Sequence, residues 1–179
     1  MTVSEWGLGG RLPDHIGVVV PDMDRAVKGL WELFQIGPWR LDRMPGTVPT
    51  WCGGVPVSNP QRLAFADWNG IQIELIQPLP GAEGPCQAFL AATGGRGGIH
   101  HAGFVMNSLA ELERTAEALR ERGCRERLVA RAVSPAGDGD TYMFELENPA
   151  GFCLELSAPI TITPEMLAGE GWYPCKPEE

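Results

Sequence analysis

Alternating apolar and polar residues recur in two similar stretches of the chain, which predict two copies of one structural unit. The first copy opens with a strand from Leu12 to Val20, and a strand that begins at His101 follows the same pattern. When His101 is laid on His15, 86 positions earlier, a glycine and a valine coincide two and four positions further along. A repeated His-x-Gly-x-Val strand indicates an internal duplication.

A second pair of similar strands closes the two copies. Residues 70–78 and 151–159 share glycine, glutamate, leucine and proline at an offset of 81. The shared glutamates are Glu74 and Glu155, and each is flanked by apolar residues on both sides. Each copy therefore opens with a histidine strand and closes with a glutamate strand.

Apolar residues at helical spacing follow each histidine strand. Asp22 and Ser108 are good N-caps, and Ser108 forms a capping box with Glu111. The spacing predicts helices from Asp22 through about Ile36 and over 109–122. Two further strands in each copy give both copies the order β-α-β-β-β. These strands are expected at 39–44 and 62–68 in the first copy, and at 125–133 and 141–147 in the second.

These elements divide the chain into four parts. The first module spans residues 12–78, a linker spans 79–98, the second module spans 99–159, and a C-terminal tail spans 160–179. The linker is expected to hold a short helix over 85–92, and the tail one helical turn near 164–168.

Residues 45–61 differ in kind from the rest of the first module. Seven Pro and Gly residues interrupt this segment, and it carries no charged residue. A long loop in a compact domain is usually mobile or functional. We expect a lid that folds Trp51 over a substrate. The alternative is a static loop in which Trp51 packs on its own module or on a second copy of the chain.

Composition and charge narrow the function classes. Of the 179 residues, 44% are hydrophobic and 21% are charged, which is typical of a folded protein. A net charge of −9 disfavours nucleic acid and anionic membrane surfaces as partners. No apolar run approaches the ~20 residues of a membrane span, and the first residues lack the features of a signal peptide. Five cysteines without a CxxC pair indicate reduced thiols and a cytoplasmic protein.

The repeated histidines and glutamates are the candidate chemistry. A carboxylate within an apolar strand costs several kcal/mol, unless it is paired, protonated or bound to a cation. Two imidazoles and two carboxylates suit one divalent transition metal ion (Zn, Ni, Co, Mn or Fe) rather than Mg or Ca. The expected ligands are His15, Glu74, His101 and Glu155. The alternative is that each of these side chains simply faces solvent. His100 is expected on the opposite face of its strand, as a core or surface hydrogen-bonding group.

The paired modules, with a histidine opening each and a glutamate closing each, resemble the vicinal oxygen chelate superfamily. That group includes glyoxalase I, methylmalonyl-CoA epimerase, extradiol dioxygenases and bleomycin-resistance proteins. The resemblance covers roughly residues 12–159, and stretch 94–101 is most similar to methylmalonyl-CoA epimerase-like proteins. It implies an α+β fold of two tandem βαβββ modules that form a curved, cleft-lining mixed sheet. It also implies a homodimer that acts on a small molecule.

The resemblance also assigns roles to individual residues. His15 and His101 match the two histidine ligands, Glu155 matches the final carboxylate ligand, and Glu74 matches the remaining one. We therefore expect a metal-dependent isomerase, epimerase or lyase of the glyoxalase or epimerase type. It would chelate vicinal oxygens of a small carbonyl or thioester substrate and stabilise an enediolate, with Glu155 or Glu74 as the base.

The sequence departs from the epimerases in two respects. First, its segment 45–61 is uncharged, whereas binding a CoA phosphate would favour Arg or Lys near the mouth of the site. Second, the epimerases also use another glutamate from the first module as a partner base. Here the only acidic residues between Glu32 and Glu74 are Asp42 and Asp67. Two alternatives stay open. One is a non-haem Fe(II) extradiol-type dioxygenase, although a fourth protein ligand would crowd its iron. The other is a non-catalytic protein that binds an antibiotic-like small molecule.

Overall fold

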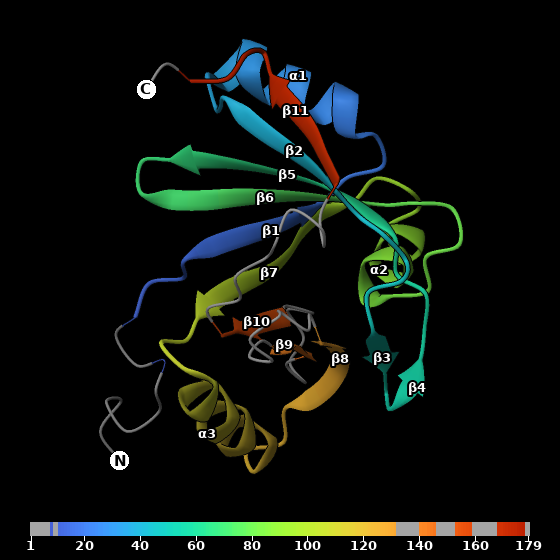
Figure 1. The fold of residues 1–179 in the computed structure, drawn as a ribbon, viewed down its shortest axis with the longest axis vertical. Coiled ribbons are helices and arrows are strands. Elements are labelled where there is room, and N and C mark those ends of the chain that lie inside the picture. The colour runs from blue at the N-terminus through green and yellow to red at the C-terminus, as the bar shows by residue number, and fades with distance from the viewer. Residues whose placement is uncertain (1–7, 9–10, 132–139, 146–152, 159–167, 178–179) are drawn as a thin grey trace.

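The computed structural model describes residues 8, 11–131, 140–145, 153–158 and 168–177. Within these residues the chain forms three helices and one sheet of eleven strands (Figure 1). The helices are α1 (Met23–Phe34), α2 (Pro85–Ala92) and α3 (Leu109–Arg120). The strands are β1 (His15–Val19), β2 (Trp39–Met44), β3 (Thr50–Cys52), β4 (Val55–Pro56), β5 (Gln61–Trp68), β6 (Ile71–Pro78), β7 (Gly98–Val105), β8 (Arg125–Arg131), β9 (Asp140–Glu145), β10 (Cys153–Ser157) and β11 (Ala168–Tyr173).

The order of the strands shows the internal repeat. The sheet runs β11-β2-β5-β6-β1-β7-β10-β9-β8-β3-β4, and β1 pairs antiparallel with β7 near its centre. Each of these two strands has a parallel neighbour on its other side, β6 beside β1 and β10 beside β7. The expected α+β fold with a curved mixed sheet is confirmed, and the strand order is the same when read outward from the centre in either direction, apart from the added edge strands.

Helices α1 and α3 cover one face of the sheet, called here the outer face. Met23 and Val27 of α1 pack against strand residues that include Leu75, and Leu112 and Ala116 of α3 pack in a second cluster on the other half. Both helices begin as predicted. The Asp22 carboxylate accepts a hydrogen bond from the Arg25 amide, and the Ser108 hydroxyl accepts one from the Glu111 amide.

Helix α2 packs on the opposite face, called here the inner face. Cys86 of α2 is buried together with Val19, Leu63 and Ile76, which come from three neighbouring strands. Side chains alternate between the two faces of a strand, so His15 lies on the same face as Val19, and Glu74 on the same face as Ile76. The linker helix therefore packs beside the face that carries the candidate ligands. Among the described helices, none combines the length and apolar composition needed to cross a membrane.

The segment 45–61 is more regular than expected. Its strands β3 and β4 pair with each other, and β3 also pairs with β8 from the second half of the chain. All seven Pro and Gly residues lie outside the three residues of β3, so they leave its pairing with β8 intact. A segment from one half thus adds a strand to the edge of the other half.

Trp51 occupies the middle of this added strand. It lies opposite Val129, which packs in the α3 cluster, whereas its neighbour Cys52 packs with Leu128 and Cys153. Cross-strand partners share a face of the sheet, so Trp51 lies on the outer side and Cys52 on the inner side. The role of Trp51 as a lid stays a prediction, and its register favours the alternative of a packed structural anchor.

The tail also departs from expectation. Ala168–Tyr173 forms β11, which pairs with β2 at the other edge of the sheet, and the rest of the expected helical turn lies outside the described residues. Glu170 holds this strand in place, because it accepts hydrogen bonds from Nε of Arg43 and Nε of Arg62, both at 2.7 Å. Both edges of the two-module sheet therefore gain an extra strand from a distant part of the chain.

The register of Trp51 leads to a stability prediction. Trp51→Ala should lower the free energy of unfolding by about 2 kcal/mol, because the folded state loses the apolar burial that the half-buried indole ring provides. Trp68→Ala is the matched control. Trp68 is 52% exposed at the end of β5, and its loss should cost less than about 1 kcal/mol. Urea unfolding of both variants measures the difference. Equal stability of both variants would show that Trp51 is not an anchor.

Candidate metal centre

The four predicted ligands come from the four central strands of the sheet. His15 opens β1, Glu74 lies in the middle of β6, His101 lies in β7, and Glu155 lies in β10. The register arranges them in two cross-strand rows. One row runs Glu74, Gly17, His101 across β6, β1 and β7, and the other runs Glu155, Gly103, His15 across β10, β7 and β1. Each row therefore holds one glutamate, one glycine and one histidine, in equivalent positions of the two halves.

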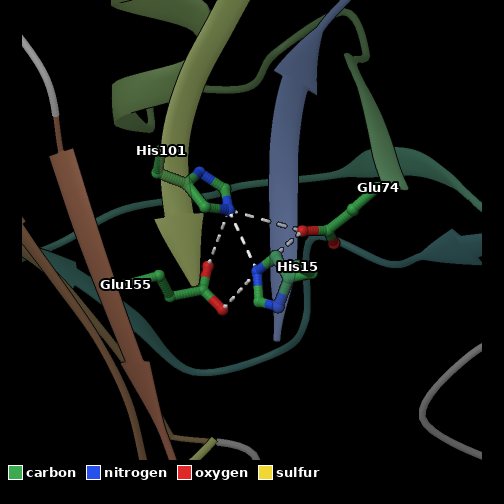
Figure 2. A group of neighbouring side chains, drawn as sticks. All are labelled: His15, Glu74, His101 and Glu155. Carbon is green, nitrogen blue, oxygen red and sulfur yellow. Dashed lines mark hydrogen bonds and ion pairs between the residues drawn. The ribbon is translucent and has the colours of Figure 1, made fainter. Parts of the chain in front are cut away.

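The four side chains converge on one point (Figure 2). Nε2 of His15 and Nε2 of His101 are 3.3 Å apart. Glu74 Oε2 lies 3.6 Å from Nε2 of His15 and 3.5 Å from Nε2 of His101. Glu155 uses both of its oxygens, with Oε1 3.5 Å from the His15 nitrogen and Oε2 3.4 Å from the His101 nitrogen.

These separations fit a single metal ion. Two ligand atoms bound about 2.1 Å from one ion are about 3.0 Å apart at a right angle and about 3.4 Å apart at the tetrahedral angle. One ligand atom from each of the four residues lies within 4.8 Å of all the others. The two imidazoles and two carboxylates fit a divalent transition metal ion by both distance and donor type.

Burial and charge favour the ionised form of Glu74, which binds a metal, and the protonated form of His101, which must lose a proton before it binds one. The His101 side chain is fully buried, the His15 side chain is 10% exposed, and each glutamate side chain is 14% exposed. Burial raises the pKa of Glu74, but the hydrogen bond from His101 and the nearby histidine charges outweigh it and hold that pKa below its ordinary value. Burial lowers the pKa of His101, but Glu155 and Glu74 raise it above its ordinary value overall. Glu74 and a protonated His101 thus compensate each other's charge until a metal ion replaces the proton.

Two glycines provide the space that the histidine rings occupy. A side-chain carbon built on Gly17 would overlap the ring of His101, and one built on Gly103 would overlap the ring of His15. Each histidine ring therefore lies directly over the glycine of the other half. The shared His-x-Gly pattern follows from this reciprocal packing, since any side chain at either glycine would displace a ligand.

His100 does not have the orientation expected from strand alternation. The register of β1 and β7 shifts between Gly17 and Val18, and this bulge adds one residue to β7. The His100 ring is consequently buried, 2% exposed, with Nδ1 3.1 Å from Nδ1 of His101. Burial is the main cause that lowers its pKa to about 4, so His100 is neutral at pH 7.

A neutral His100 can orient its neighbour. When Nδ1–H of His101 donates to Nδ1 of His100, Nε2 of His101 keeps its lone pair for a metal ion. Phe89 of α2 packs edge-on against His100, with ring centroids 5.0 Å apart. The sequence does not predict this contact, because a bulge arises from the pairing of β7 with β1 and leaves no periodic pattern in β7 itself.

The comparisons with known proteins identify the family of the chain. The family model described as Glyoxalase/Bleomycin resistance protein/Dioxygenase superfamily matches residues 14–144. The chain belongs to this superfamily. No curated protein sequence matches the chain.

Solved structures of similar fold include methylmalonyl-CoA epimerase from Mycobacterium tuberculosis, with 20% identity and a TM-score of 0.57 over 83% of this chain and 87% of that one. A hypothetical protein from Bacillus halodurans C-125 also has 20% identity, with a TM-score of 0.55 over 83% of this chain and 94% of that one. A mutant 4-hydroxymandelate synthase from Streptomyces coelicolor has 16% identity and a TM-score of 0.50, over 82% of this chain and 48% of that one. At these identities the likeness establishes the fold alone.

The reciprocal packing leads to a prediction about the glycines. Gly17→Ala and Gly103→Ala should each weaken the binding of Co²⁺ by about 100-fold or more, because the added methyl displaces a histidine ligand. Gly29→Ala in α1 is the matched control. No atom lies within 4 Å of a methyl at Gly29, so this variant should keep its metal affinity and gain up to about 1 kcal/mol of stability. Visible absorption of bound Co²⁺ measures the affinity, and circular dichroism checks the fold. Wild-type affinity in a folded Gly17 or Gly103 variant would contradict the proposed cause.

Proposed function

We propose that the chain binds one divalent transition metal ion (Zn, Ni, Co, Mn or Fe) through His15, Glu74, His101 and Glu155, and acts as an isomerase, epimerase or lyase. Its substrate would be a small carbonyl or thioester compound with two neighbouring oxygens. The observation that carries this proposal is the convergence of two imidazole nitrogens and two carboxylates, with nitrogen–oxygen distances of 3.4–3.6 Å. Membership of a superfamily that includes enzymes supports a catalytic role.

A bound ion would act as a Lewis acid that stabilises the enediolate left when a proton leaves the carbon beside the substrate carbonyl. The chain's own residues hold the metal ligands in place and exclude water from the site. His15 and His101 are held by the glycines opposite them, so the ligand nitrogens are fixed before a substrate binds. The low exposure of all four side chains keeps most water from the reacting carbon.

Both carboxylates are candidates for the base, and their geometry favours Glu74. Each oxygen of Glu155 lies closest to a different histidine, so both of its oxygens are engaged. Glu74 presents Oε2 to both histidines, while its other oxygen points away from them (Figure 2). That second oxygen can accept a proton from a substrate while the first remains in the ligand set.

Neither alternative function gains support from the described residues. An Fe(II) dioxygenase needs open positions for substrate and O₂, and Glu74 lies as close to the two histidines as Glu155 does. A non-catalytic binding protein has no need of two buried carboxylates, which are costly without a cation. The homodimer and the cytoplasmic location stay predictions.

The proposal predicts separate effects on metal content and on proton transfer. Purified protein should hold about one equivalent of Co²⁺ or Ni²⁺ per chain, and His101→Ala should remove it, because one of the two imidazole ligands is lost. Glu74→Gln should keep the metal, since an amide oxygen can still bind. It should nevertheless slow exchange of the substrate α-proton with D₂O by about 100-fold or more.

Elemental analysis and proton NMR on a panel of 2-oxo acids and acyl thioesters measure these two quantities. Glu155→Gln is the matched variant at the equivalent carboxylate, and Glu32→Gln on the exposed side of α1 is the surface control. Loss of exchange only in Glu155→Gln would move the role of base to Glu155. A protein that cannot be loaded with metal would end the proposal.

A further inference from the structure

Arg40 extends the row of the candidate centre along the inner face. The register places Arg40 opposite Phe65, and Phe65 opposite Glu74, so these residues of β2, β5 and β6 continue the row that runs through Gly17 to His101. Phe65 packs in the same cluster as Leu63 and α2, which lies on the inner face. A cation and an aromatic ring therefore lie beside the candidate base, on the same face of the sheet.

The Arg40 side chain is held in place but only partly used. Its Nε donates to Asp42 Oδ2 at 2.8 Å, and its guanidinium carbon lies 4.9 Å from the centre of the Phe65 ring. Asp42 is itself buried on the inner face, two positions along the same strand. These two contacts fix the plane of the guanidinium group and its direction along the row.

The outer end of the guanidinium group remains available. The Arg40 side chain is 49% exposed, and within the part of the chain that the structure describes no acceptor contacts Nη1 or Nη2. A guanidinium group that is held in one orientation, with its two terminal nitrogens unpaired, is suited to a carboxylate or another planar oxyanion. It can bind such a group through two hydrogen bonds.

The distance between Arg40 and the metal centre sets the length of the ligand. Neighbouring strands lie about 4.8 Å apart, and the guanidinium group stands over Phe65, one strand from Glu74. An anion at Arg40 would therefore lie about 5–10 Å from oxygens held at the metal centre.

We propose that Arg40 selects the substrate by binding an anionic group, so that the substrate class is a carbonyl or thioester compound with a carboxylate about 5–10 Å from its chelated oxygens. This inference rests on the proposed function, because the other end of the substrate is held at the metal centre. Arg40 binds and orients the substrate, and Asp42 positions Arg40. Proton abstraction remains with the carboxylates of the centre.

A pair of rigid chelating probes tests this assignment on the Co²⁺-loaded protein. The first probe, 4-carboxybenzohydroxamate, carries two neighbouring oxygens at one end and a carboxylate at the other. The second, 4-carbamoylbenzohydroxamate, has nearly the same shape with a neutral amide. Titration followed by Co²⁺ absorption gives the affinity for each probe. The wild-type protein should bind the carboxylate probe about tenfold tighter than the amide probe, and added salt should reduce this preference.

Variants separate the role of Arg40 from that of the metal centre. Arg40→Gln should abolish the preference while keeping the metal content and the affinity for the amide probe. Arg43→Gln is the matched control. Arg43 lies three residues further along the same strand, on the other face, where it pairs with Glu170, and its loss should leave the preference unchanged.

The possible failures are distinguishable. Equal affinity of the wild-type protein for the two probes, or a preference that survives in Arg40→Gln, would overturn the assignment of Arg40 while leaving the metal centre intact. Failure to bind Co²⁺, or no spectral response to either probe, would overturn the proposed function, and the inference about Arg40 with it.

Discussion

Two histidine rings pack over two glycines at the β1–β7 junction, and this packing determines how the two halves of the sheet meet. Each ring occupies the space that a side chain on the opposite strand would fill, so the register of these strands and the position of the ligands are fixed together. A shift by one residue would place side chains where the rings lie. The parallel neighbours β6 and β10 then bring one glutamate each to the same point. The centre thus combines equal contributions from the two halves.

The surrounding elements pack around this arrangement on both faces of the sheet and at its edges. Helices α1 and α3 cover the outer face, α2 packs beside the centre on the inner face, and the strands β3 and β11 extend the two edges. These contacts join segments that are distant in sequence, so the histidines and glutamates are held by the whole sheet rather than by one loop. Rigid strands suit a metal centre, because preorganised ligands need little rearrangement when an ion binds.

Much of the fold and of the candidate site could be predicted from the sequence, because the duplication places chemically equivalent residues at equivalent positions. His101 occupies the position in the second copy that His15 occupies in the first, and Glu155 corresponds to Glu74 in the same way. This equivalence identified the four side chains that converge. The remaining features depend on pairing between distant segments, which leaves no local period. The bulge at His100 and the edge strands β3 and β11 are of this kind. The sequence also did not predict which face of the sheet carries Arg40, since the alternation in β2 is weak. Only the pairing of Arg40 with Phe65 places it on the inner face.

The proposed function requires that four side chains, two from each half of the sheet, hold one metal ion. Anomalous X-ray diffraction at the cobalt edge, from crystals of the protein grown with Co²⁺, tests it most directly. We expect one dominant anomalous peak, about 2.0–2.2 Å from Nε2 of His15, Nε2 of His101 and one oxygen each of Glu74 and Glu155. No peak at this point, or a dominant peak held by other side chains, would show that these four residues do not form the metal centre.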